Sequence, residues 1–351
     1  MIIEIDPQSD PRWDQFVESH PLGLICHLSG WKQVLEESFP QMKGRYLAIL
    51  SDDNSIRAAL PVFEIRSILT GNRLVSIPFA TNCDPLISSN EDLRELLDSV
   101  IELSTKLRIS RIELRALASW PLIHDDRIGI TIHYNSHQLS LDVSLEELIK
   151  TFSKQVRRKI KTFSKTDFNL QIAGSERDLL EFYHLYVKTR KRLGLPPQPY
   201  LFFQLLWGEF SPTKCITLLL VKYEGQLIAG LIMFKFKDRC SWDYLASDAS
   251  FQNLHTTYFI LWEAIKFAHS EGYRIFDFGR TSISNAGLMS FKNLWGTKII
   301  TLPKFYYPEK LCLRSNDQEG SVSYELIRKI SKYIPDSLFQ SIGNFMYRHL
   351  G

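Results

Sequence analysis

Apolar residues recur along the 351-residue chain with two periods, one helical and one that alternates as in β-strands. In residues 1–144 the pattern predicts a helix, a hairpin, a strand, a helix and two strands, at 28–39, 45–66, 74–79, 91–107, 112–117 and 137–143. Residues 145–310 repeat this order, with helices at 145–165, 176–192 and 256–271 and strands at 216–222, 227–237, 240–246, 273–278 and 298–305. The succession predicts an α/β chain of two domains with one plan, followed by a helical tail over residues 311–351.

A β-rich run near the end of the second half carries polar residues where it stops. Residues 272–280 read Gly-Tyr-Arg-Ile-Phe-Asp-Phe-Gly-Arg, which predicts a buried strand that delivers Asp277 and Arg280 into a loop. Apolar residues at helical spacing follow over 288–295, so Lys292 lies on a short helix tethered to the same strand end and is expected to point away from the packed face. The three charges suit either a reaction site or an ion pair at a strand–helix corner.

The composition is that of a globular protein, with 44% hydrophobic and 23% charged residues. The formal net charge of +3 provides no general field that would recruit DNA. The longest aliphatic run, residues 216–221, is far shorter than the ~20 residues of a membrane span, and the N-terminus lacks the features of a signal peptide. We therefore expect a soluble cytoplasmic protein without a DNA partner.

Five cysteines are scattered along the chain, without a CxxC pair and without a histidine at the usual metal-ligand spacing. They are Cys26, Cys83, Cys215, Cys240 and Cys312. This spacing predicts no metal site and no disulfide framework.

The sequence lacks the motifs that mark several common enzyme classes. The chain contains no Ser-His-Asp order, HExxH, Walker loop or glycine-rich dinucleotide turn, which excludes the corresponding hydrolases, kinases and dehydrogenases. Aminolysis of an activated acyl group needs only a positioned amine, a proton acceptor and a cation for the oxyanion. Charged residues near the strand end at 272–280 meet that requirement.

Three short runs resemble a known family. They are Phe-Asp-Phe-Gly-Arg at 276–280, a Gly-Leu pair at 287–288 and Phe-Lys-Asn-Leu-Trp-Gly at 291–296. Together they resemble the C-terminal signature of the FemAB-like acyltransferases, and are similar to the FemAB-related proteins of exopolysaccharide and PEP-CTERM systems. The resemblance extends over roughly the whole chain. It implies two tandem GNAT-like domains, over 1–144 and 145–310, each a mixed and mostly antiparallel sheet flanked by helices, with the active site in the second.

The resemblance also implies an activity and a set of site residues. The activity is transfer of an acyl or aminoacyl group onto an amine of a cell-envelope or exopolysaccharide precursor, without a covalent intermediate. Lys292 would provide the oxyanion cation, and Asp277 or Asp243 would orient or deprotonate the amine. The expected substrate-binding residues are Arg157, Lys161, Arg190, Tyr244, Arg280, Asn285 and Phe291.

The basic helix at 145–165 and strand 240–246 contribute several of these residues. Arg157 and Lys161 are one helical turn apart and can reach one anion, although a run of this kind also suits a solvated face. In the strand, alternation predicts that Trp242 and Tyr244 share one face and that Asp243 points to the other.

The acyl donor stays open between an aminoacyl-tRNA and an acyl-CoA, and we expect no tightly bound cofactor. The turn at 251–256 that precedes a helix has no glycine, whereas a coenzyme A cradle is normally glycine-rich. An acyl-CoA-dependent N-acetyltransferase is one alternative, and a non-catalytic polysaccharide-assembly protein is another. The expected acceptor is a small-molecule or lipid-linked saccharide or peptide.

The tail contains two amphipathic helices, over 323–334 and from Pro335 onward. Basic residues on these helices allow a peripheral contact with the inner face of a membrane. The alternative, which we favour, is that the apolar face docks on the body of the protein.

Overall fold

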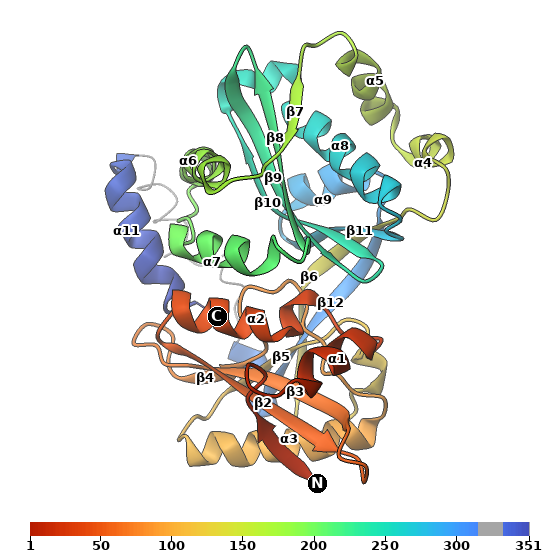
Figure 1. Cartoon of the computed structure of the whole chain (residues 1–351). Coiled ribbons are helices and arrows are strands. Elements are labelled where there is room, and N and C mark those ends of the chain that lie inside the picture. Colours follow the sequence, from red (N-terminus) through yellow and green to blue (C-terminus); the bar gives the residue numbers. More distant parts are fainter. Residues whose placement is uncertain (315–332, 351) are drawn as a thin grey trace. The chain divides into compact units, whose positions relative to one another are not determined.

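The computed structural model describes residues 1–314 and 333–350 (Figure 1). The chain divides into two compact units, each with its own hydrophobic core. Unit 1 comprises Met1–Tyr134, Thr301–Asp317 and Phe345–Gly351, and unit 2 comprises Asn135–Ile300 and Gln318–Asn344.

Unit 1 is a sheet with α3 on one face and α1 and α2 on the other (Figure 1). Its strands are, in spatial order, β1 (Ile2–Ile5), β2 (Met42–Leu50), β3 (Ile56–Ile65), β4 (Arg73–Val75), β5 (Ile112–Arg115) and β12 (Lys298–Tyr307). Its helices are α1 (Arg12–Ser19), α2 (Ser29–Ser38) and α3 (Asn90–Lys106), with short 3₁₀ turns at η1 (Ile25–His27), η2 (Trp120–Leu122) and η4 (Glu309–Arg314). Neighbouring strands are antiparallel except β4 and β5, which α3 connects.

Unit 2 has the same architecture. Its strands are, in spatial order, β7 (Asn169–Ile172), β8 (Ile216–Tyr223), β9 (Gln226–Phe236), β10 (Arg239–Ser247), β11 (Ile275–Ser282) and β6 (Gly129–Ser140). Its helices are α4 (Leu145–Thr151), α5 (Lys154–Phe163), α6 (Glu176–Leu193), α7 (Tyr200–Phe210), α8 (Thr256–Ser270) and α9 (Ala286–Asn293), with a 3₁₀ turn at η3 (Ala249–Leu254). α5 and α8 lie on one face of the sheet, and α6 and α7 on the other (Figure 1).

The two units repeat one order of strand pairing. Three antiparallel pairings, β1 to β4 and β7 to β10, are followed in each unit by one parallel pair, β4–β5 or β10–β11. A helix, α3 or α8, connects the strands of each parallel pair, as a parallel connection requires. The repeated plan predicted from the element order is therefore confirmed.

The boundaries of the units differ from the expected ranges 1–144 and 145–310. β12 follows the second repeat in sequence but pairs with β5 of unit 1, from Lys304↔Arg115 to Tyr307↔Ile112. β6 precedes the second repeat and neighbours β11 of unit 2. A period-2 pattern shows that such a segment is a strand, but it does not show which sheet edge accepts it.

The single helix expected at 145–165 is two helices. Phe152 has extended backbone angles, φ −71° and ψ 150°, and ends α4. Ser153 then caps α5, because its hydroxyl accepts the N–H of Val156 at 3.3 Å. The N–H of Ser153 donates to the carbonyl of Leu294 at 2.8 Å, which ties the break between the helices to the end of α9.

The described part of the tail forms α11 (Asp336–Tyr347), which packs on unit 2 through its first two turns. Phe339 is fully buried, and Lys191 of α6 forms an ion pair with Asp336 at 2.6 Å. These contacts support docking of the tail on the protein, whereas most of the expected helix at 323–334 lies outside the described residues. Within residues 1–314 and 333–350, no helix is both long and apolar enough to cross a membrane.

Candidate active site

The parallel ladder between β10 and β11 ends beside two carboxylates. The register runs from Arg239↔Ile275 to Ser241↔Asp277. On its other side β10 stays paired with β9 as far as Ser247, but the register shifts between Trp242 and Tyr244. Asp243 is therefore the extra residue of a β-bulge, a feature that redirects side chains next to active sites. The bulge and the ladder's end place Asp243 and Asp277 near each other.

Asp277 is held by groups from three strands. Its Oδ2 forms an ion pair with Arg239 Nη1 at 2.9 Å, and its side chain is 5% exposed. Its Oδ1 accepts the N–H of Gly279 at 2.8 Å and, at 3.4 Å, the hydroxyl of Ser136 from β6. A carboxylate with these three donors is held firmly in position. Arg239 and Ser136 were not predicted, because each lies at an ordinary strand position.

Asp243 has a different environment. Burial raises the pKa of its carboxyl to about 7, and the nearby charge of Asp277 acts in the same direction, against the Ser241 hydroxyl that donates to it. Part of the residue remains exposed, so the desolvated carboxyl lies beside accessible surface. A carboxylate that titrates near neutral pH is suited to accept a proton.

Lys292 turns inward from α9 and is 3% exposed, although the helical pattern predicted that it would point away from the packed face. Its ammonium donates to the carbonyl oxygens of Gly279 at 3.0 Å and Arg280 at 3.1 Å. Burial lowers the pKa of Lys292 to about 8, while the charge of Asp277 opposes that shift. Two of the three ammonium donors are used, so one remains for a ligand or water.

Gly279 is the residue on which this arrangement depends. Its φ of +72° lies in the left-handed region that favours glycine. In this conformation its N–H reaches Asp277 while its carbonyl reaches Lys292, at 2.8 Å and 3.0 Å. The sequence pattern Phe-Gly-Arg at 278–280 is explained by this turn.

His137 is a further buried neighbour of Lys292 that sequence reasoning missed. It lies on β6, fully buried, with Nδ1 3.4 Å from Thr297 Oγ1 and Nε2 3.2 Å from Met289 Sδ. Burial, followed by the charge of Lys292, lowers the pKa of His137 to about 4. The imidazole is therefore neutral at physiological pH. Its strand belongs to the sheet of unit 2, which local patterning did not indicate.

Trp242 and Tyr244 do not share a face, and that prediction is wrong. Trp242 packs on Phe278 and Phe291, and the ammonium of Lys292 lies 5.4 Å from the Trp242 ring centroid. Tyr244 is buried against Phe203 of α7, with ring centroids 4.9 Å apart. The bulge at Asp243 breaks the alternation on which the prediction rested.

Three of the other expected binding residues make contacts within the fold. Arg190 donates to the carbonyl of Pro196 at 3.1 and 3.3 Å and so fixes the loop after α6. Asn285 caps α9, because its side-chain oxygen accepts the N–H of Leu288 at 3.1 Å. Phe291 packs on Tyr258, with ring centroids 5.2 Å apart, within the core of unit 2. These contacts give all three residues a structural role.

Three basic residues remain accessible. The side chain of Arg280 is exposed at the strand end. On α5, Arg157 is half-buried and Lys161 is exposed, and neither forms an ion pair with any described residue. Lys159 of the same helix lies 3.6 Å from the centroid of the Tyr258 ring, which joins α5 to α8. α5 therefore presents cations next to the helices that flank the site.

Comparison with a family profile identifies the part of the chain that carries this arrangement. Residues 150–293 match the family described as an acetyltransferase (GNAT) domain. The matched stretch lies within unit 2 and makes up less than half of the chain. The domain includes Asp243, Asp277 and Lys292, and the predicted enzyme class, acyltransferase, is confirmed. The sequence matches no curated protein.

Solved structures extend the GNAT likeness to the whole chain. FemX has a TM-score of 0.71 at 17% identity, over 93% of this chain and 100% of that one. L-PGS from Bacillus licheniformis has a TM-score of 0.54 at 15% identity, over 93% and 98%. A tandem GNAT protein from the clavulanic acid biosynthesis pathway has a TM-score of 0.50 at 11% identity, over 87% and 97%. The predicted FemAB-like fold of tandem GNAT domains is therefore confirmed.

Proposed function

We propose that the chain transfers an acyl or aminoacyl group onto an amine of a cell-envelope or exopolysaccharide precursor by direct aminolysis. The observation that carries this proposal is the group of three side chains at the end of the β10–β11 ladder. Asp243 has a pKa of about 7, Asp277 is held in an ion pair, and Lys292 has a pKa of about 8. FemX and L-PGS, both similar in fold, support a substrate of the cell-envelope type.

In the proposed reaction the amine nitrogen attacks the acyl carbonyl carbon. Asp243, as the carboxylate, accepts the proton that the amine loses. The remaining donor of Lys292 stabilises the oxyanion, and Asp277 keeps Lys292 charged. Collapse of the tetrahedral intermediate breaks the bond to the donor's sulfur or ribose oxygen, which takes the proton back from Asp243 and leaves as a thiol or hydroxyl. No side chain forms a bond to the acyl group.

For the donor we propose an aminoacyl-tRNA, with acyl-CoA as the alternative. The segment before α8 has no glycine, and His255 there adopts a left-handed φ of +56°. A Cβ at such a position restricts the close approach of a pyrophosphate to the backbone. The accessible cations Arg157 and Lys161 suit phosphates of a larger donor.

The experiment offers two donors to the purified chain with a mixture of amine acceptors. One reaction contains labelled acyl-CoA, and the other contains tRNA charged with a labelled amino acid. Transfer from charged tRNA alone supports the proposed donor, whereas transfer from acyl-CoA alone makes the chain an ordinary N-acetyltransferase. Absence of transfer from both, with acceptor binding intact, would support the non-catalytic alternative. A contact with the inner face of the membrane would bring the chain to a lipid-linked acceptor, and liposome sedimentation tests that contact.

A further inference from the structure

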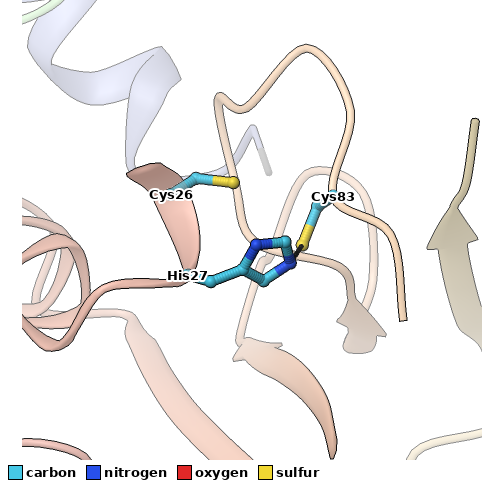
Figure 2. Close-up of side chains that lie close together, drawn as sticks. All are labelled: Cys26, His27 and Cys83. Atoms are coloured by element: carbon cyan, nitrogen blue, oxygen red, sulfur yellow. Dashed lines mark hydrogen bonds between the residues drawn. The ribbon is translucent and has the colours of Figure 1, made fainter. Parts of the chain in front are cut away.

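Three side chains that can bind metal meet inside unit 1, far from the residues discussed above in sequence. Cys26 and His27 lie on η1, and Cys83 lies in the loop between β4 and α3. Figure 2 shows the three side chains close together, with a dashed line between the ring of His27 and the sulfur of Cys83. All are buried, with exposed fractions of 4%, 0% and 2%. Local spacing could not reveal this cluster, because Cys83 is 56 positions from His27 in sequence.

The distances fit the ligand shell of a metal ion. The Sγ atoms of both cysteines and a ring nitrogen of His27 all lie within 4.8 Å of one another. His27 Nε2 is 3.4 Å from Cys83 Sγ. In a tetrahedral zinc site, with Zn–S of about 2.3 Å and Zn–N of about 2.0 Å, two ligand atoms lie roughly 3.5–3.8 Å apart. The ligand atoms therefore need to move by no more than about 1 Å to reach these separations.

A neighbouring polar group without a partner points to a missing ligand. Tyr46 is fully buried, and its hydroxyl has no hydrogen-bond partner. Burial, followed by the charges of Cys83 and Cys26, raises the pKa of this phenol, so the hydroxyl lies within electrostatic reach of both sulfurs. A buried hydroxyl without a partner is costly, and an ion with a bound water would satisfy it.

We propose that Cys26, His27 and Cys83 bind one Zn²⁺ ion, with a water or the Tyr46 hydroxyl as the fourth ligand. Two thiolates and an imidazole form a donor set that zinc prefers. The charges balance, because two thiolates neutralise the divalent ion inside the protein. Complete burial is typical of a structural zinc site, whereas reactive cysteines are usually accessible.

The hydrogen bonds of His27 show which contacts must change when zinc binds. Nδ1 of His27 accepts the N–H of Leu24 at 2.9 Å, so in the ion-free state Nε2 carries the proton and donates to the carbonyl of Asp84 at 3.0 Å. Zinc at Nε2 requires this proton to leave and Nδ1 to become protonated, which breaks the Leu24 contact. The Asp84 contact is lost as well, and two hydrogen bonds are small beside the binding of zinc by thiolates. Both thiols must also lose their protons to bind the ion. Binding should therefore release protons.

The proposal is tested on the full-length chain, reduced and freed of metal by a chelator. Titration with Zn²⁺ against a chromophoric chelator should give one ion per chain. Co²⁺ in its place should give a thiolate-to-cobalt charge-transfer band and the strong visible bands of a tetrahedral site. Zinc should slow alkylation only at Cys26 and Cys83, mapped by peptide mass spectrometry. These three measurements need no variant, so they remain decisive if substitution prevents folding.

Single substitutions assign the ligands. Cys26→Ser and Cys83→Ser should each lower zinc affinity by more than about 100-fold, beyond the cost of changes outside the ligand shell. Cys215→Ser is the matched control, because that thiol is outside the cluster and should leave binding unchanged. Binding that is equally tight in all variants would overturn the proposal. So would absence of the charge-transfer band, or a Cys26–Cys83 disulfide as the form that resists mild reductant.

Discussion

The ammonium of Lys292 donates to the carbonyl oxygen of Gly279 at 3.0 Å, and this bond joins α9 to the end of β11. Gly279 can accept it because its left-handed backbone turns the carbonyl toward the helix while its N–H faces Asp277. The contact connects a helix, a turn and a carboxylate in one network.

Replacing Lys292 tests whether its positive charge stabilises the oxyanion. Lys292→Met keeps the aliphatic stem but removes the charge, and should lower kcat by about 100- to 1,000-fold. Lys298→Met is the control, because Lys298 is exposed at the start of β12 and should keep full activity. The readout is steady-state acyl transfer with whichever donor the two-donor experiment supports. Retention of the wild-type rate by Lys292→Met would show that transfer does not depend on this ammonium.

Asp243 and Lys292 together predict a narrow pH optimum. Activity requires Asp243 deprotonated, above its pKa of about 7, and Lys292 protonated, below its pKa of about 8. The rate should therefore rise through pH ~7 and fall above pH ~8. Asp243→Asn should remove the acidic limb along with most of the rate, whereas Asp238→Asn, at an exposed position, should change neither.

Asp243→Asn also tests whether the raised pKa of Asp243 makes stability depend on pH. The carboxyl of Asp243 binds its proton more tightly in the folded chain, where its pKa is about 7, than at its ordinary value of 3.8. This contribution to stability is complete below pH ~4 and is lost as the pH rises to ~7. Asp243→Asn should therefore flatten the decline in Tm across that window. If the Tm of Asp243→Asn declines as much as that of the wild type, the decline is caused by another titrating group.

Substitution of two glycines distinguishes the effect of backbone strain on stability from its effect on activity. Gly279→Ala and Gly272→Ala both place a Cβ on a left-handed residue, at φ +72° and +82°. Each should lower the free energy of unfolding by about 1–2 kcal/mol, measured by urea denaturation. Only Gly279→Ala should also lower activity, because Gly279 holds Asp277 and Lys292. Equal activity in the two variants would show that the turn's geometry is not needed for transfer.

The basic helix α5 should bind the donor through one of its faces. The double variant Arg157→Gln/Lys161→Gln should raise KM for an anionic donor by about tenfold or more, with little change in kcat. Lys154→Gln/Arg158→Gln is the matched control, because it removes the same charge from the same helix with the same spacing. If both pairs raise KM equally, α5 acts only through its net charge.

Docking of the tail depends on a close contact. A Cβ on Gly343 of α11 would lie 2.2 Å from the carbonyl oxygen of Pro197. Gly343→Ala should therefore displace α11 and lower stability by about 1–3 kcal/mol. Gly208→Ala in α7 meets no atom within 4 Å and should raise stability slightly. Thermal unfolding compares them, and an unchanged Tm for Gly343→Ala would contradict this docking.

Local sequence patterns were sufficient for the elements and for one part of the site. The repeated order of helices and strands follows from periodicity, since each element must bury one face. The strand and turn at 272–280 were also predictable, because a β-rich run bounded by glycines predicts a strand that ends in a loop. Asp277, Arg280 and Lys292 were named as candidates on that basis and on the family resemblance.

Contacts between residues distant in sequence were decided only by the tertiary structure. Periodicity predicted an outward-pointing Lys292, but the loop carbonyls at Gly279 and Arg280 draw its ammonium into the interior. Regular alternation could not reveal the bulge at Asp243, because a bulge is a property of two paired strands. The cluster of Cys26, His27 and Cys83 likewise exists only because η1 and the β4–α3 loop meet in the folded chain. A local pattern specifies the face that an element buries, whereas long-range packing determines which residues it meets there.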